Sequence, residues 1–226
     1  MRTKLYRFDV IKNHDKVIDN WHPLRSSIKW HRRSDFFGNQ NPITLELACG
    51  YGEYTFWLAF RHPETNYVGV DIKGERFYHG LTQAEHQWLA NVWFVRIIIQ
   101  NLEQLFAPSE VDDIWIVHPD PYPKWADERR RLTYWRFLDI YYRLLSDGWL
   151  LRLKTDDHDL RYYSVDSIMQ DGRWELVDST IDLHSSPLLF DHYDITTRYE
   201  RRGIEQGRTI CYGIRRKRDC VANHGK

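Results

Sequence analysis

Short apolar runs alternate with longer amphipathic segments along most of this chain, and that alternation limits the fold more than any other feature. The runs predict strands, and the segments between them, whose apolar residues recur with a helical period, predict helices. Strands are predicted at residues 43–48, 67–72, 91–99, 113–118, 149–154, 174–179 and 209–215, and helices at residues 54–61, 74–89, 133–145 and 161–170. Because this alternation places buried strands side by side with helices above and below, it predicts an α/β fold with a mostly parallel sheet.

Residues 1–41 differ from the rest of the chain. They are polar, basic and aromatic, and no strong period stands out among them. Residues 38–42, Gly-Asn-Gln-Asn-Pro, are typical of a hinge. The chain has 226 residues, enough for one α/β domain and too few for two ordinary ones. We therefore expect an N-terminal arm or lid over residues 1–41 and one main domain over residues 42–226.

Charge and cysteine content narrow the class of partner. The formal net charge is +0, which argues against a chain coated in positive charge but is compatible with a local basic patch. The three cysteines are too few and too scattered for a disulfide framework, and there is no C-x-x-C pair. No apolar run reaches about 18 residues, and residues 1–10 lack an apolar signal core. We expect a cytoplasmic protein with no metal site and no membrane partner.

The turn after the first predicted strand carries a chemical signal. Residues 45–52 read Leu-Glu-Leu-Ala-Cys-Gly-Tyr-Gly, and Gly50 and Gly52 let the backbone turn tightly and approach a ligand. Asp71 ends the second predicted strand, where a carboxylate can accept hydrogen bonds from both hydroxyls of a ribose. Since parallel sheets bind ligands at the carboxyl ends of their strands, these residues predict a site for a nucleoside-bearing cofactor.

Position 55 distinguishes two classes of cofactor. A dinucleotide fingerprint, G-x-G-x-x-G, needs a third glycine there, and this chain has Thr55. Glu46, inside the first predicted strand, suits a ligand with an ammonium group better than one with a diphosphate. These two residues favour S-adenosylmethionine over a nicotinamide cofactor. Gln100 and Asn101, after the third predicted strand, are equal candidates to contact the adenine.

The fourth predicted strand ends in residues 118–124, His-Pro-Asp-Pro-Tyr-Pro-Lys. Three prolines within five residues cannot continue a strand or a helix and give a stiff loop. The loop presents one acid, Asp120, and one base, Lys124, at the carboxyl edge of the sheet. Residues 129–131, three arginines, follow as a basic patch suited to phosphates.

Two later segments add more charge. Residues 154–157, Lys-Thr-Asp-Asp, end the fifth predicted strand and bring Asp156 next to the proline loop. Residues 194–202 contain Thr197, Arg198, Tyr199 and Glu200, and taken alone they indicate a charged loop or helix.

Taken in order, these motifs resemble the bacterial tRNA (guanine-N7)-methyltransferase family. The family pattern combines an acid–glycine loop with P-D-P-x-P-[KR], R-L-T, T-D and T-x-[FY]-E. In this chain the five motifs stand at residues 46–52, 119–124, 131–133, 155–156 and 197–200. The chain also departs from the pattern. Many members have Trp in place of Tyr122 and Phe in place of His118, and residues 125–128, Trp-Ala-Asp-Glu, interrupt the usual basic run.

The resemblance implies a Rossmann-like methyltransferase with a seven-stranded sheet and helices on both faces. It implies an enzyme that transfers a methyl group from S-adenosyl-L-methionine to N7 of a guanosine in the tRNA variable loop, at tRNA position 46. The cofactor would be lined by Glu46, Gly50, Gly52, Asp71, Gln100 or Asn101, and Asp120. The target nucleotide would be held by Lys124, Asp156, Thr197, Arg198, Tyr199 and Glu200. The partner would be tRNA, and the enzyme a monomer or a homodimer.

The chemistry of the acceptor suggests roles for these residues. N7 of guanine carries a lone pair and no proton, so alignment matters more than a general base. Positive charge then develops on the purine, and a nearby carboxylate stabilises it. Asp120 is the predicted catalytic residue, with Asp156 as the second candidate. Thr197 and Glu200 are expected to read the guanine.

Two other functions fit parts of the sequence. A methyltransferase of the same fold could act on a protein or a small molecule, which the neutral net charge favours and the two specific motifs at residues 119–124 and 197–200 oppose. A non-catalytic RNA-binding relative could keep the fold, although acids remain at the strand ends. A nicotinamide enzyme is a distant third because of Thr55.

Overall fold

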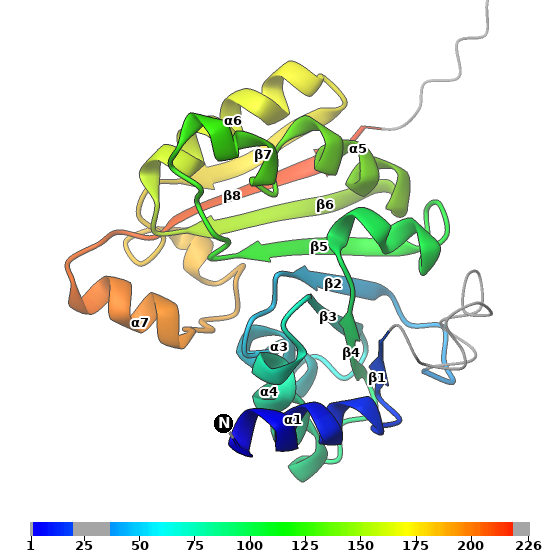
Figure 1. Ribbon diagram of the computed structural model, residues 1–226. Helices are drawn as coiled ribbons and strands as arrows, with labels where there is room; N and C mark the ends of the chain where they lie inside the picture. Colours follow the sequence, from blue (N-terminus) through cyan, green and yellow to red (C-terminus); the bar gives the residue numbers. More distant parts are fainter. Residues whose placement is uncertain (1, 20–36, 219–226) are drawn as a thin grey trace, which may run out of the picture.

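An eight-stranded sheet forms the centre of the computed structural model, which describes residues 2–19 and 37–218 (Figure 1). The strand order is β1-β4-β3-β2-β5-β6-β8-β7. The strands are β1 (Val17–Ile18), β2 (Ile43–Leu47), β3 (Asn66–Asp71), β4 (Val92–Arg96), β5 (Val111–Val117), β6 (Leu145–Thr155), β7 (Trp174–Thr180) and β8 (Cys211–Lys217). Neighbours from β1 to β6 are parallel, and β8 is antiparallel to both β6 and β7. The predicted mostly parallel sheet is confirmed.

Helices cover both faces of this sheet. The α-helices are α1 (Arg2–Lys12), α3 (Glu53–Arg61), α4 (Gly74–His86), α5 (Trp135–Leu144), α6 (His158–Asp171) and α7 (Arg198–Glu205), and the 3₁₀ turns are η2 (Ile99–Gln104), η3 (Trp125–Arg130) and η4 (Pro187–Leu189). Successive residues of a strand point to opposite faces. Thus Ile114 and Ile116 of β5 pack in the core that α5 and α6 share, and Trp115 and Val117 pack in the core that α1, α3 and α4 share. Figure 1 shows these two groups of helices.

The strand order places the site. From β2 the sheet grows outward through β3 and β4 on one side, and through β5 and β6 on the other. At such a reversal the loops that leave neighbouring parallel strands diverge and open a crevice at the carboxyl edge. The turns after β2 and β5 meet at this point.

The N-terminal segment contains elements that the sequence did not predict. Helix α1 packs on α4, where Ile11 is 2% exposed and lies against Gly74, and Lys4 pairs with Glu75 at 3.4 Å. Strand β1 pairs with β4 and makes the eighth strand, one more than predicted. Two residues are too few to show a strand period, which explains the miss. The predicted arm or lid spans residues 1–41, and its residues 20–36 lie outside the described residues.

Strand β6 begins earlier than predicted. The sequence predicted a helix over residues 133–145 and a strand from residue 149, but β6 follows α5 directly from Leu145. The register shifts between Val111 opposite Leu145 and Asp113 opposite Leu150. Gly148 has φ of +77°, a conformation that glycine adopts without strain, so the extra residues form an irregularity inside the strand.

Candidate active site

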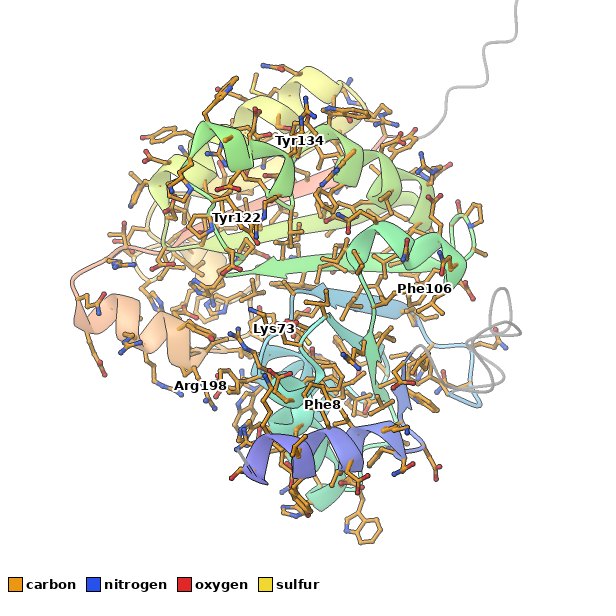
Figure 2. All side chains as sticks on the ribbon, in the orientation of Figure 1. Phe8, Lys73, Phe106, Tyr122, Tyr134 and Arg198 are labelled. Atoms are coloured by element: carbon orange, nitrogen blue, oxygen red, sulfur yellow. The ribbon has the colours of Figure 1, made fainter. Side chains whose placement is uncertain are left out.

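The carboxyl edge of the sheet opens into a cleft of about 860 Å³. Its walls come from the turns after β2, β3, β4 and β5, from the end of β6 and from α7. Figure 2 labels Lys73, Tyr122 and Arg198, which come from three distant parts of the chain and lie around this edge. A cleft of this size can enclose a nucleoside-sized ligand together with part of a second one.

Glu46 lines this cleft from inside β2 and is 4% exposed. Its Oε2 accepts a hydrogen bond from the backbone N–H of Thr55 at 2.7 Å and another from the Thr55 hydroxyl. Its Oε1 receives no hydrogen bond from residues 2–19 or 37–218. Burial raises the pKa of Glu46 to about 8, although both bonds from Thr55 act to lower it. A buried carboxylate with one open oxygen is suited to a cation brought by a ligand.

Asp71 meets the turn after β2. Its Oδ2 accepts a hydrogen bond from the backbone N–H of Gly50 at 2.9 Å, and its Oδ1 accepts one from the backbone N–H of Lys73 at 2.7 Å. Each carboxylate oxygen keeps lone-pair capacity for another donor. Since Asp71 lines the cleft, it can accept hydrogen bonds from two hydroxyls of a ligand.

Gly52 has a packing role. It has φ of +70° and precedes α3, and Gly80 of α4 lies directly against it. A Cβ at position 80 would lie 2.5 Å from the carbonyl oxygen of Gly52, and one at position 52 would lie 2.6 Å from a ring carbon of Phe94. The second glycine of the motif therefore lets α4 approach the turn, while Gly50 faces the cleft.

The proline loop at residues 118–124 is held from behind by Arg131. The guanidinium of Arg131 donates hydrogen bonds to the carbonyl oxygens of Pro121 and Tyr122 at 3.1 to 3.2 Å. It also lies 4.3 Å from the ring centre of Tyr163. Asp120 is exposed and lines the cleft, with the Tyr122 hydroxyl 3.5 Å from its Oδ2.

The predicted basic patch is therefore divided. Arg131 is committed to the loop, whereas Arg130 stacks on Tyr122 at 4.3 Å and donates to Asp127 at 3.1 Å. Arg129 is exposed. Of the three arginines, only Arg129 presents its charge to solvent without a side-chain contact in the described part of the chain.

A group of buried and half-buried charges, the acid–base cluster, lies at the end of β6. It comprises His118, Lys154, Asp156, His184 and Glu200. Asp156 Oδ1 lies 3.2 Å from His118 Nδ1, and its Oδ2 accepts from Arg208 at 2.8 Å. The hydrogen bond from His118 is the main reason that the pKa of Asp156 falls well below its usual range.

Glu200 is the most buried member of the acid–base cluster, with 0% exposure. It lies 2.7 Å from Lys154 Nζ and 2.9 Å from His184 Nε2. Burial alone would raise the pKa of Glu200, but His118 and Lys154 lower it to about 2. Glu200 is therefore a carboxylate whose charge is already balanced by the protein.

Helix α7 closes one side of the cleft. Thr197 caps it, since its hydroxyl accepts from the backbone N–H of Glu200 while the Glu200 carboxylate accepts from the backbone N–H of Thr197. Arg198 donates to Glu53 at the start of α3, with contacts of 2.8 to 2.9 Å, and lies 3.8 Å from the ring centre of Tyr51. The first turn of α7 is thereby fixed to the cofactor-side turn.

Comparisons with known proteins agree with this geometry. A family model described as a putative methyltransferase matches residues 40–212. The tRNA (guanine-N(7)-)-methyltransferase of Cytophaga hutchinsonii is 39% identical over 218 residues, which cover 93% of this chain and 96% of the relative. The chain belongs to the tRNA (guanine-N7)-methyltransferase family. The relatives of the same name from Porphyromonas gingivalis and Brevibacillus brevis are 38% and 34% identical, over 92% and 88% of this chain and 81% and 90% of theirs.

Solved structures share the fold of this member of the tRNA (guanine-N7)-methyltransferase family. A variant of the 16S rRNA (adenine(1408)-N(1))-methyltransferase from Catenulisporales acidiphilia, solved with cosubstrate SAM, aligns with a TM-score of 0.61 and 16% identity. It covers 84% of this chain and 92% of its own. The 16S rRNA methyltransferase KamB aligns with a TM-score of 0.62 and 12% identity, over 83% and 91% of the two chains. At these identities the likeness concerns the fold.

Not every residue that the sequence suggested for a tRNA (guanine-N7)-methyltransferase site lines the cleft. Eight of them do: Glu46, Gly50, Asp71, Gln100, Asp120, Asp156, Thr197 and Tyr199. Five do not: Gly52, Asn101, Lys124, Arg198 and Glu200. Gln100 and not Asn101 therefore faces the ligand space. Lys124 is exposed beyond the loop, and Glu200 lies beneath the cleft, so its direct contact with guanine finds no support in this geometry.

The sequence reasoning also missed residues of this site. Lys154 was noted only as the end of a strand. Lys73, Arg76 and Arg202 line the cleft, but they were not considered as site residues. Thr55 was used only to exclude a dinucleotide, but it holds Glu46. The T-x-x-E spacing of a capping box was visible at residues 197–200 and signals a helix start.

Two further findings concern the described residues as a whole. Within residues 2–19 and 37–218, no group of three or more His, Cys, Asp or Glu side chains is arranged to hold a metal ion. No helix in those ranges has the length and apolar character needed to cross a membrane.

Proposed function

We propose that this chain transfers a methyl group from S-adenosyl-L-methionine to N7 of a guanosine in the variable loop of tRNA, at tRNA position 46. Membership of the tRNA (guanine-N7)-methyltransferase family supports the reaction. The observation that carries the proposal is that Glu46 of β2, Asp71 of β3, and Asp120 and Asp156 after β5 and β6 line one cleft in a chain of that family. Since tRNA is the substrate, we also propose that the protein acts in the cytoplasm.

The residues present fit S-adenosylmethionine. Glu46 is a buried acid with an open oxygen and a raised pKa, so it calls for a cationic partner such as the ammonium of the methionine part. Asp71 has acceptor capacity for the two ribose hydroxyls, and Gln100, which lines the cleft, is assigned to the adenine. When bound, this cofactor supplies an electrophilic methyl group on a sulfonium.

Asp120 is assigned to the transfer step. Guanine N7 has no proton to lose, so the protein has to align it rather than deprotonate it. The purine gains positive charge as the N7–methyl bond forms, and a fixed carboxylate at the cleft stabilises that charge. Arg131 and the flanking prolines hold the backbone around Asp120, so the carboxylate is preorganised.

The acceptor nucleotide is assigned to the side of the cleft that β6 and α7 form. Asp156, Thr197 and Tyr199 line it. A carboxylate can accept from N1–H and the N2 amino group of guanine, and Tyr199, 45% exposed, offers a ring for stacking. Arg198 and Glu200 support this wall from behind, through Glu53 and Lys154.

The phosphates of the RNA are assigned to cations at the rim. Lys73, Arg76, Arg136, Arg202 and Arg208 line the cleft, and Lys124 and Arg129 are exposed beside it. These cations can contact RNA phosphates locally although the net charge of the whole chain is neutral. The protein would bind tRNA as a monomer or a homodimer.

One experiment tests both the proposed tRNA substrate and the role of Asp120. The purified protein is incubated with labelled S-adenosylmethionine and unmodified tRNA, and the labelled nucleotide is mapped. We expect N7-methylguanosine in the variable loop, and we expect Asp120→Ala to bind the cofactor normally while kcat falls at least about a hundredfold. Labelling of protein or small molecules instead of tRNA would replace the proposal with a different acceptor, and cofactor binding without any transfer would indicate a non-catalytic RNA-binding protein.

A further inference from the structure

His118 occupies a strained and enclosed position at the end of β5. Its φ is +46°, a left-handed conformation that few residues other than glycine adopt, and its side chain is only 5% exposed. The family resemblance and the transfer step leave this histidine without a role. A strained backbone that buries an ionisable ring at an active-site edge calls for a function.

The His118 ring lies between two carboxylates from different elements. Nδ1 lies 3.2 Å from Asp156 Oδ1 at the end of β6, and Nε2 lies 3.9 Å from Glu200 Oε2 on α7. Nε2 is buried and has no hydrogen-bond partner at that distance. A small approach of α7 would turn the second contact into a hydrogen bond.

Other charged groups face the same space. Lys154 on β6 pairs with Glu200 and opposes a positive charge on His118, while Arg208, after α7, pairs with Asp156 at 2.8 Å. His184, in the loop before α7, takes the other oxygen of Glu200 at 2.9 Å, and His192 lies 3.4 Å from Lys154.

We propose that His118 is a positioning residue for the acceptor guanosine: its protonated ring holds Asp156 with one nitrogen and Glu200 with the other, and so fixes the end of β6 and helix α7 around the nucleotide. This inference rests on the proposed function, because Asp156 and α7 form the wall assigned to the guanosine. His118 acts through these two residues and needs no contact with the reacting atoms.

The protonation state of His118 decides whether both contacts form. Burial lowers the pKa of His118, but the hydrogen bond with Asp156 and the nearby carboxylate of Glu200 raise it by more, so it lies above its ordinary value. The neutral ring carries a proton on only one nitrogen, and the other then presents a lone pair to a carboxylate. Nucleotide binding should therefore weaken as the pH rises through this pKa, while the transfer step is spared.

Two variants separate positioning from mere packing. His118→Asn keeps an N–H donor near the place of Nδ1, tolerates a positive φ and cannot titrate. His118→Ala removes both donors. His62→Asn is the matched control, because His62 pairs with exposed Glu64 and does not line the cleft.

The experiment measures KM for tRNA and kcat from about pH 6 to pH 9 at saturating cofactor. For the unmodified protein and His62→Asn, we expect KM to rise about tenfold over this range with little change in kcat. His118→Asn keeps a donor to Asp156 but none to Glu200, so its KM should be flat and about tenfold higher, like that of the unmodified protein at high pH. For His118→Ala, which has neither donor, KM should be flat and higher still. A His118→Asn protein that keeps the original pH dependence, or variants that change kcat instead of KM, would overturn the proposal.

A second measurement stands independently of activity. The pKa of the His118 ring is followed by NMR in the unmodified protein and in Asp156→Asn. We expect the Asp156→Asn change to lower this pKa by about one unit or more, because it removes the carboxylate at 3.2 Å. If no tRNA is methylated, the proposed function fails, but the NMR measurement still decides whether His118 pairs with Asp156. If the pKa of His118 is unchanged in Asp156→Asn, the positioning role is rejected even if tRNA is methylated.

Discussion

Replacing Glu46 by Gln tests whether Glu46 is a buried acid that is costly to ionise in the cofactor-free cleft. The substitution keeps the size of the side chain and an acceptor oxygen for the two hydrogen bonds from Thr55. It removes only the ability to ionise. Because Glu46 is buried inside β2, the energy of ionising it there should appear in the stability of the cofactor-free protein.

The expected change in the free energy of unfolding follows from the shift in the pKa of Glu46. Burial raises the pKa of Glu46 from 4.5 to about 8. In the unfolded chain the group ionises above pH 4.5, while in the folded protein it stays protonated up to about pH 8, so the folded state binds the extra proton. The stability tied to this group is complete below pH 4.5 and is lost as the pH rises, by about 1.4 kcal/mol per pH unit. At pH 7 the loss reaches about 3 kcal/mol.

Glu46→Gln should therefore be more stable than the unmodified protein by about 3 kcal/mol at pH 7 and by less than about 1 kcal/mol at pH 5. Urea denaturation of the cofactor-free proteins at both pH values measures this difference. Glu64→Gln, at an exposed position, is the control and should change the free energy of unfolding by less than about 0.5 kcal/mol.

The same substitution should weaken cofactor binding. Glu46 must ionise to pair with an ammonium group, so cofactor affinity of the unmodified protein should improve by up to about tenfold per unit as the pH rises from about 6 to 8. Glu46→Gln should bind more weakly and lose this dependence, as calorimetry would show. A variant that is no more stable at pH 7, or equally stabilised at pH 5 and pH 7, would refute the assignment of a buried acid with a raised pKa.

Three further perturbations test other parts of the site. In Gly80→Ala, the added methyl group meets the carbonyl oxygen of Gly52, so the free energy of unfolding should fall by about 1–3 kcal/mol in thermal denaturation; an unchanged melting temperature would mean that α4 is not tightly packed there. Arg131→Lys cannot reproduce the forked contacts to Pro121 and Tyr122, and kcat should fall about tenfold with unchanged cofactor affinity in steady-state assays. Lys124→Ala should reduce the slope of log affinity for tRNA against log salt by about one, and an identical slope would remove this lysine from the phosphate contacts.

The sequence by itself determined the framework of the protein. Apolar runs and helical periods are local properties, so the strands from residue 43 onward and the acids at their ends were predictable. Position along the chain was enough to assign Glu46, Asp71 and Asp120 to one edge of a parallel sheet, and these residues do line the cleft. The two-residue β1 was not predictable, because a strand so short has no period.

The tertiary structure alone decided how the charges are distributed around that edge. Arg131 and Arg129 look alike in a row of arginines, but only Arg131 faces the backbone of the proline loop. Glu200 belongs to a motif that suggested base recognition, yet α7 docks so that Lys154 and His184 take its carboxylate.

His118 illustrates why the sequence alone could not predict these charge contacts. Its two neighbouring carboxylates follow 38 residues later, directly after β6, and still farther along on α7, and neither spacing has a periodic signature. Such contacts depend on which strands become neighbours and how a helix docks across their ends. Local sequence patterns reveal which residues reach the edge of the sheet, but the charge that each one meets there is fixed only when distant segments pack together.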